Sequence, residues 1–202
     1  MQKNNYELEL IDRYPKANKI NKNITILAIS DTHNHLDINE LENINDDYEV
    51  CVLLGDISQN DLDLILKYIP REKIIGIHGN CDRNDFLDKN NINNIHGKVI
   101  DVNGIKFAGI SGSYLSHNGF NHEESLTFLN NLPNADILIS HDKAYTKKGI
   151  DKYHLGLKGI TTYLYKERIA YHLHGHLHQN DIDTLLNGTI SIGVYGIKII
   201  KL

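Results

Sequence analysis

The chain has 202 residues, 41% hydrophobic and 23% charged, with a formal net charge of −5. These values suit one folded domain and exclude both a disordered chain and a generally basic nucleic-acid-binding protein. No apolar run approaches the roughly 18 residues of a membrane span, and the polar N-terminus lacks the apolar core of a signal peptide. The two cysteines, Cys51 and Cys81, do not resemble the disulfide framework of a secreted protein. We therefore expect a cytoplasmic protein without a membrane partner.

The N-terminal segment, residues 1–23, is polar except for the alternating run YELELI at residues 6–11. Alternation with a period of two is typical of a strand that has one buried face. We therefore expect either an edge strand added to the main fold or a loosely attached arm. The remaining residues, 24–202, show no linker or internal repeat and are expected to form one domain.

Short apolar runs rich in β-branched residues then recur along the chain, and each ends in a polar segment. They are residues 24–30, 48–54, 73–78, 106–111, 135–140 and 169–174. Their length and composition predict strands buried on both faces. Amphipathic stretches at 60–69, 122–132 and 157–167 lie between some of them and predict helices. Residues 189–200 predict two further strands with no helix between them, so we expect an α/β fold with a mixed sheet.

The polar residues that follow these predicted strands are good metal ligands. They are Asp31, His33, Asp56, Asn80, His141, His176 and His178. Each alone has an ordinary explanation, because an aspartate after a strand commonly caps a helix or turn and a single histidine is commonly structural. Their shared position indicates a metal site, because ligands bind beyond the carboxyl ends of strands in open α/β folds. Glycine precedes Asp56, Asn80 and His176, which permits close approach of the chain to an ion.

Five of these segments, in this order, resemble the motifs of the calcineurin-like metallophosphoesterases. They are DTH at 31–33, GD at 55–56, GNCD at 79–82, SH at 140–141 and GHLH at 175–178. The cysteine after Asn80 resembles the small phosphodiesterase branch of this family. The resemblance implies a four-layer α/β sandwich, in which two mixed β-sheets pack together and are flanked by helices.

The resemblance also implies two divalent metal ions bridged by one carboxylate. The first set of ligands would be Asp31, His33, Asp56 and His178, and the second Asp56, Asn80, His141 and His176. Carboxylate, amide and imidazole donors without thiolate suit manganese, which we expect first, or iron, zinc, nickel or cobalt. A carboxylate bridge suits the spacing of about 3.5–4 Å that two-metal hydrolases use. His172 and His174 continue the alternating histidines of GHLH backwards into the strand, where we expect them either to have structural roles or to support the metal ligands.

The implied reaction is direct hydrolysis by a hydroxide that bridges the two ions. Asp56 and Asn80 would be catalytic, and Asn80 would also orient the phosphate. Many relatives have histidine where this chain has Cys81, and a thiol is a poorer acid for the leaving group. His117 is a candidate replacement, although it also reads as a surface loop residue. Arg83 is a candidate phosphate contact, and a salt bridge to a nearby aspartate explains it equally well.

We therefore predict a metal-dependent phosphodiesterase or phosphatase that acts on a small phosphoester or nucleotide-like substrate. Two alternatives remain open. One is a nuclease of the same superfamily, which the net negative charge and the short chain disfavour. The other is a catalytically inactive protein-interaction scaffold of the same fold, which the complete set of seven ligand candidates disfavours. His154, between the last two motifs, is a candidate supporting residue.

Overall fold

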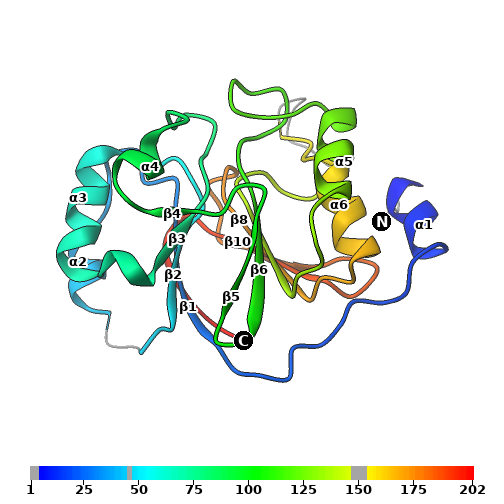
Figure 1. The fold of residues 1–202 in the computed structure, drawn as a ribbon, viewed down its shortest axis with the longest axis horizontal. Helices are drawn as coiled ribbons and strands as arrows, with labels where there is room; N and C mark the ends of the chain where they lie inside the picture. The colour runs from blue at the N-terminus through cyan, green and yellow to red at the C-terminus, as the bar shows by residue number, and fades with distance from the viewer. Residues whose placement is uncertain (1–4, 45–46, 147–153) are drawn as a thin grey trace.

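Two β-sheets packed face to face form the centre of the fold (Figure 1). The computed structural model describes residues 5–44, 47–146 and 154–202. The first sheet has the order β11-β1-β2-β3-β4, from Gly196–Lys201, Thr25–Ser30, Val50–Leu53, Ile74–Gly76 and Asn93–Asn94. The second has the order β5-β6-β7-β8-β10-β9, from Val99–Val102, Ile105–Ile110, Ile137–Ser140, Tyr171–His174, Ile190–Gly193 and Ile182–Thr184.

Both sheets are mixed, as the sequence predicted. In the first sheet β1, β2, β3 and β4 are parallel and β11 runs antiparallel to β1. In the second sheet β6, β7, β8 and β10 are parallel, while β5 and β9 are antiparallel edge strands. The two strands predicted within residues 189–200 exist, but they belong to different sheets. The chain thus crosses from one sheet to the other between Gly193 and Gly196.

The period of two along β1 shows why its residues form a central strand. Ile26 and Ala28 pack between the two sheets, whereas Leu27 and Ile29 pack beneath the helices on the outer face. All four side chains are buried. A strand buried on both faces needs apolar residues at every position, which accounts for the continuous apolar runs in the sequence.

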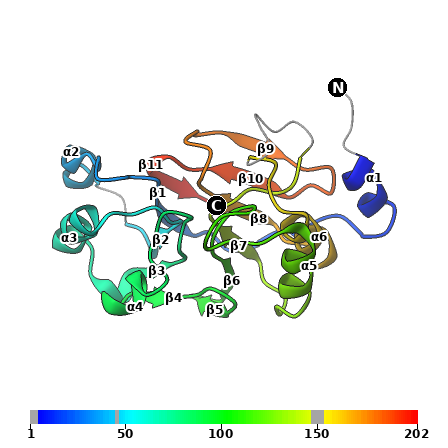
Figure 2. The ribbon, with the colours of Figure 1, turned by 90° about the horizontal axis from the view of Figure 1, so that it is seen from above.

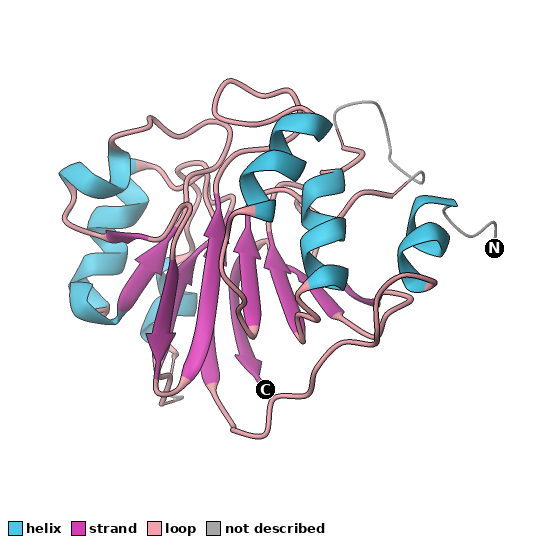
Figure 3. Cartoon of the chain, turned by 45° about the vertical axis from the view of Figure 1, so that its right-hand side comes forward, coloured by secondary structure: helices cyan, strands magenta, loops and turns pink. Residues whose placement is uncertain are grey.

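Helices cover the outer face of each sheet (Figures 2 and 3). The first sheet carries α2 (Ile38–Glu42), α3 (Gln59–Tyr68) and α4 (Phe86–Lys89), and the second carries α5 (His122–Asn130) and α6 (Lys158–Lys166). Leu62 and Ile65 of α3 are buried, as its amphipathic pattern predicted. A short 3₁₀ helix, η1 (Arg71–Lys73), precedes β3. The four-layer sandwich of two mixed sheets flanked by helices is confirmed.

The edge strand expected near the N-terminus is wrong, because these residues form helix α1 (Asn5–Ile11), which packs against α6. The Tyr6 hydroxyl lies 2.6 Å from that of Thr162. The Tyr165 hydroxyl donates a 2.8 Å hydrogen bond to Glu7. Because Tyr6 and Leu10 are four residues apart, they lie on one side of a helix, and the packing partner α6 decides between helix and strand.

Candidate metal centre

The loops that follow five strands converge at one edge of the two sheets. The Asp31 amide donates a 3.0 Å hydrogen bond to the Gly55 carbonyl, which joins the loops after β1 and β2. The Gly175 amide donates a 3.1 Å bond to the His141 carbonyl, which joins the loops after β7 and β8. The His176 amide donates a 2.9 Å bond to Oδ2 of Asp31 and connects the two sheets. Side chains far apart in sequence therefore meet at one place.

Hydrogen bonds to one carboxylate oxygen of Asp31 orient the side chain, and the other oxygen faces two histidines. Its Oδ2 accepts hydrogen bonds from the Ser30 hydroxyl at 2.6 Å and from the His176 amide. Its Oδ1 is buried and accepts no hydrogen bond from the described residues. This oxygen lies 3.4 Å from Nε2 of His178 and 3.9 Å from Nε2 of His33. A buried carboxylate oxygen beside two imidazole nitrogens is a donor set that fits a divalent cation.

The two carboxylate oxygens of Asp56 also have different partners, one a backbone amide and the other a pair of histidines. Its Oδ1 accepts a 2.8 Å hydrogen bond from the Cys81 amide. Its Oδ2 lies 3.5 Å from Nε2 of His141 and 3.7 Å from Nε2 of His33. One carboxylate oxygen therefore stands between histidines that come from different sheets.

His141 is fully buried, and its ring orientation is defined by hydrogen bonds. Its Nδ1 donates to the Leu54 carbonyl at 2.8 Å, so Nε2 is the nitrogen that faces the carboxylates, 2.9 Å from Oδ1 of Asn80. Burial lowers the pKa of His141, but the Asp56 carboxylate outweighs burial and raises it to about 9. Burial raises the pKa of Asp56, and His141 outweighs it and lowers the value to about 2. A metal ion at this Nε2 would replace its proton.

Most of the ligand candidates have left-handed backbone conformations. The φ angles are 53° at Asp31, 45° at His33, 55° at Asp56, 67° at His176 and 51° at His178. Residues other than glycine seldom adopt positive φ angles, and such strain concentrates at functional sites. These conformations distinguish the strand ends from ordinary turns or helix caps.

Two of the glycines that the sequence singled out are required by close contacts. A Cβ atom on Gly79 would lie 2.0 Å from Oδ1 of Asp56. A Cβ atom on Gly175 would lie 2.0 Å from the Ser30 hydroxyl oxygen and 2.5 Å from Oδ2 of Asp31. Only glycine lets these two segments pass so near the carboxylates.

The alternating histidines of residues 172–178 separate into two groups. The ring of His178 lies 5.1 Å from that of His33, and the ring of His176 lies 5.0 Å from that of His141, centroid to centroid. His172 instead lies within β8 and is buried. Its two ring nitrogens are 2.6 Å and 3.0 Å from the hydroxyl oxygens of serines on the flanking strands, Ser140 and Ser191.

His174 is also buried in β8, with its Nδ1 nitrogen 3.3 Å from the Gly175 carbonyl. Burial lowers the pKa of both strand histidines, His172 and His174. Neither belongs to a group of side chains within ligand distance of one another among the described residues. Their placement agrees with a structural role, one of the two roles that we expected for them.

Asp82, the last residue of the GNCD segment, acts as a brace, by which we mean a side chain that holds neighbouring loops of the centre together through hydrogen bonds. Sequence reasoning missed this role. Oδ2 of Asp82 accepts hydrogen bonds from the amides of Asp56 at 2.8 Å and Gly79 at 2.7 Å, and its Oδ1 accepts one from Ile57 at 3.2 Å. The carboxylate thus joins the loops after β2 and β3. Its place in the motif was the available signal, but only the structure shows what it contacts.

Asp61 braces the loop that carries Asp31 and His33. This buried carboxylate accepts hydrogen bonds from the Thr32 hydroxyl and the amides of Asn34 and Leu36, at 2.7, 2.7 and 3.2 Å. The Ser58 hydroxyl, which caps α3, donates a fourth at 2.8 Å. Burial raises the pKa of Asp61, and the hydrogen bonds from Thr32 and Ser58 outweigh it, so the net shift is downward.

Five of the seven metal-ligand candidates border a cavity of about 400 Å³. Its described lining residues are His33, Asp56, Asn80, Cys81, His154, His176, Leu177 and His178. The cavity therefore includes His154 as well as predicted ligands. Burial and Asp56 raise the pKa of the Cys81 thiol to about 11, so this residue is a weak acid.

His117 and Arg83 border a separate hollow of about 430 Å³, which shares Asn80 and Cys81 with the metal-site cavity. His117 is exposed. The Arg83 side chain is 77% exposed, and its Nε lies 3.3 Å from Oδ1 of Asp85, as the salt-bridge explanation predicted. The structure thus brings the seven metal-ligand candidates together and leaves His117 and Arg83 beside them.

A model of the calcineurin-like phosphoesterase superfamily domain matches residues 24–192. The chain belongs to this superfamily. Its members are metal-dependent phosphoesterases, and the Asp/His groups of the chain fit divalent ions. No curated protein matches the chain by sequence.

Solved structures of low sequence identity share this superfamily fold. A putative 5′-nucleotidase from Staphylococcus aureus, in complex with alpha-ketoglutarate, is 14% identical with a TM-score of 0.58, covering 90% of this chain and 51% of that chain. The protein TT1561 of Thermus thermophilus is 13% identical with a TM-score of 0.56, covering 90% and 99%. Vps29 of Entamoeba histolytica with Zn²⁺ is 11% identical with a TM-score of 0.50, covering 86% and 74%.

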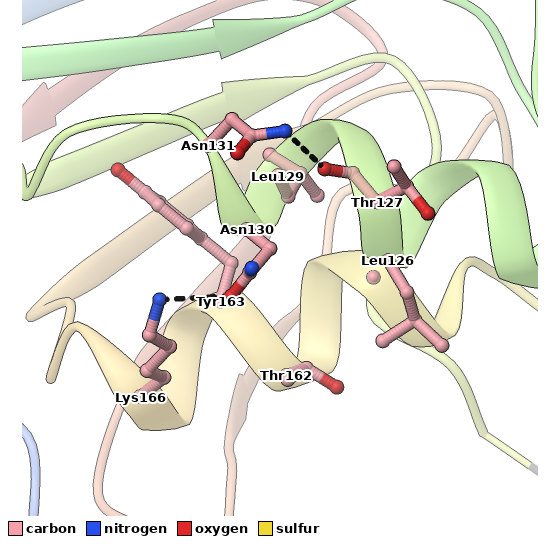
Figure 4. Close-up of a pocket in the computed structure, with 9 residues that line it drawn as sticks. Leu126, Thr127, Leu129, Asn130, Asn131, Thr162, Tyr163 and Lys166 are labelled. Carbon is pink, nitrogen blue, oxygen red and sulfur yellow. Dashed lines mark hydrogen bonds between the residues drawn. The ribbon is translucent and has the colours of Figure 1, made fainter.

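A further groove of about 440 Å³ lies between α5 and α6 (Figure 4). Lys166 donates a 3.0 Å hydrogen bond to the Asn130 side chain at its edge, and Leu126 and Tyr163 contribute apolar surface. None of the predicted site residues lines it. Among the described residues, no helix has both the length and the hydropathy needed to cross a membrane.

Proposed function

We propose that this superfamily member holds two divalent ions, manganese first among them, and hydrolyses a small or nucleotide-like phosphodiester. The position of Asp56 is the observation that supports the proposal most. Its Oδ2 lies between His33 and His141, each of which belongs to a different ligand set. A carboxylate shared in this way suits a pair of ions about 3.5–4 Å apart.

The remaining ligand candidates divide around Asp56 into two sets. Asp31, His33 and His178 would complete the first set, because their donor atoms lie within 4.8 Å of one another. Asn80, His141 and His176 would complete the second. The two ions, when bound, would activate water for attack and neutralise charge on the phosphoryl oxygens.

Within this proposal the chain itself positions the substrate. Oδ1 of Asn80 faces His141, and its Nδ2 donates one hydrogen bond to the Cys81 sulfur at 3.2 Å. The second hydrogen on Nδ2 would donate to a phosphoryl oxygen. A thiol with a pKa of about 11 donates a proton poorly at neutral pH. The leaving group would therefore need little protonation, or would receive its proton from His117 in the adjoining hollow. Arg83 would contact substrate only after leaving Asp85.

The comparisons and the cysteines support the remaining parts of the proposal. A putative 5′-nucleotidase shares the fold, in line with a phosphoester substrate. Cys51 and Cys81 are both free thiols, which suits the reducing cytoplasm where we propose that the protein acts.

The test loads the purified chain with Mn²⁺, counts bound metal by elemental analysis and measures hydrolysis of bis-p-nitrophenyl phosphate. We expect two ions per chain and hydrolysis that depends on added metal. Asp56→Asn should lower kcat at least about 10³-fold and reduce bound metal. Asp63→Asn, at an exposed position that lines neither cavity, should change neither. Full activity in Asp56→Asn would refute the mechanism, and fewer than one ion per chain would refute a dinuclear centre. Absence of any phosphoester hydrolysis would favour the scaffold alternative.

A further inference from the structure

We propose that His154 binds the phosphoryl group of the substrate, donating a hydrogen bond from its imidazole without being a metal ligand. This inference rests on the proposed function and assigns it a further residue. His154 lines the cavity of about 400 Å³ that five of the seven ligand candidates border. Its ring centroid lies 4.9 Å from that of His176, with the ring planes 36° apart.

Backbone contacts hold His154 at the cavity. Leu155 accepts a 2.8 Å hydrogen bond from the Thr146 amide, and the Leu157 amide donates a 3.1 Å bond to the Lys143 carbonyl. These bonds tie residues 154–157 to residues 143–146, which follow His141. The position of His154 is therefore coupled to the strand end that carries a ligand candidate.

Gly156 makes this close pairing possible. Its φ is 78°, and a Cβ atom there would lie 2.5 Å from the Ala144 carbonyl oxygen. Any larger residue would separate the two segments and move His154 away from the cavity. The turn that presents the imidazole thus depends on a specific residue.

The composition of the cavity indicates what His154 does there. Its described lining residues include no lysine and no arginine, so this described part of the cavity offers a phosphoryl group imidazole, amide and thiol donors instead. The two ligand sets already supply four donors each, with Asp56 shared. Among the described histidines that line the cavity, His154 is the one assigned to neither ligand set, and an imidazole N–H can donate to a phosphoryl oxygen.

The experiment measures binding of inorganic phosphate to the Mn²⁺-loaded protein by calorimetry, so that it does not depend on turnover. Wild type is compared with His154→Ala, with His154→Gln, which keeps an N–H donor, and with His35→Ala as the matched control. His35 is exposed and lies outside the cavity. Thermal unfolding checks that each variant is folded, and elemental analysis counts its bound Mn²⁺.

We expect His154→Ala to keep the metal content of wild type and to bind phosphate at least about tenfold more weakly, the effect of losing one hydrogen bond to a charged group. His154→Gln should recover part of the affinity, and His35→Ala should match wild type. An unchanged phosphate affinity, or a loss of Mn²⁺ in His154→Ala, would overturn the inference. If wild type hydrolyses no phosphoester but its phosphate affinity depends on His154, the proposed hydrolase fails and the phosphate contact stands.

Discussion

Asp82→Asn should destabilise the fold and weaken metal binding, although Asp82 is not a ligand candidate. In the structure its two oxygens accept three backbone amides, from Asp56, Ile57 and Gly79. The substitution preserves the size of the side chain but converts one acceptor oxygen into a donor. With the amide oxygen facing Asp56 and Gly79, the new NH₂ group would oppose the amide of Ile57.

The magnitude follows from these three bonds. A hydrogen bond to a charged acceptor contributes about 1.5–3 kcal/mol, and one to a neutral acceptor about 0.5–1.5 kcal/mol. The hydrogen bond from the Ile57 amide is lost, and those from the Asp56 and Gly79 amides now have a neutral acceptor instead of a charged one. Burial and the nearby Asp56 raise the pKa of Asp82, so removal of its charge offsets the weakening of the two remaining bonds, and the lost bond to Ile57 with its opposed donors dominates. We expect the free energy of unfolding to fall by about 2–4 kcal/mol.

Urea unfolding of the metal-free protein measures this change, and Mn²⁺ titration by calorimetry measures the effect on the centre. The midpoint should fall by about 1 M urea or more, and Mn²⁺ should bind at least about tenfold more weakly. Asp85→Asn makes the same chemical change three residues away, where the carboxylate pairs with Arg83 and Lys89 in solvent. If Asp82→Asn shifts neither measurement further than Asp85→Asn does, the brace that we describe does not exist.

Three further predictions concern the same region. Gly79→Ala places a carbon 2.0 Å from Oδ1 of Asp56, so Mn²⁺ affinity measured by calorimetry should fall at least about tenfold. Gly188→Ala meets nothing within 4 Å and should leave that affinity unchanged. Because the pKa of Asp61 is lowered in the fold, its stabilising effect is complete above about pH 4 and is lost as pH falls through the lowered value. Urea unfolding of Asp61→Asn should accordingly depend less on pH between about 5 and 2 than that of wild type, and parallel curves would contradict this assignment. Chelation of the metal with EDTA should lower the melting temperature and leave the far-UV circular dichroism spectrum unchanged. The reason is that bound metal adds only about 2.7 kcal/mol to the stability at a metal concentration one hundred times its Kd. Loss of the helical and strand signal would show instead that the chain folds only with metal bound.

Much of this architecture was predictable because a strand that is buried on both faces appears in the sequence as a continuous apolar run. Residues 24–30 and 135–140 are apolar at almost every position, and they form β1 and β7 between helices and the opposite sheet. The order of the five polar segments was equally informative. The resemblance assigned seven ligand candidates, and the structure places them at one edge of the sheets, where the ligand set itself stays a prediction.

Other elements depend on partners that the local sequence does not reveal. The alternating run at residues 6–11 left an edge strand and a loosely attached arm open, and the segment instead forms helix α1 against α6. β4 (Asn93–Asn94) is polar and β9 (Ile182–Thr184) is exposed, so neither carries the alternating pattern of a buried strand, and both exist through pairing with a neighbour. His154 reaches the cavity only because its segment pairs with residues 143–146.

The braces matter because the ligand candidates are held in unfavourable conformations. Five of them have left-handed backbones, at about 1–3 kcal/mol each. Their sum is comparable with the whole stability of a domain, about 5–15 kcal/mol, so the surrounding structure must offset it. Asp61 and Asp82 do so by accepting backbone amides from these loops rather than by facing the ions. We therefore expect the geometry of the centre to depend on these two carboxylates as well as on the ligand candidates.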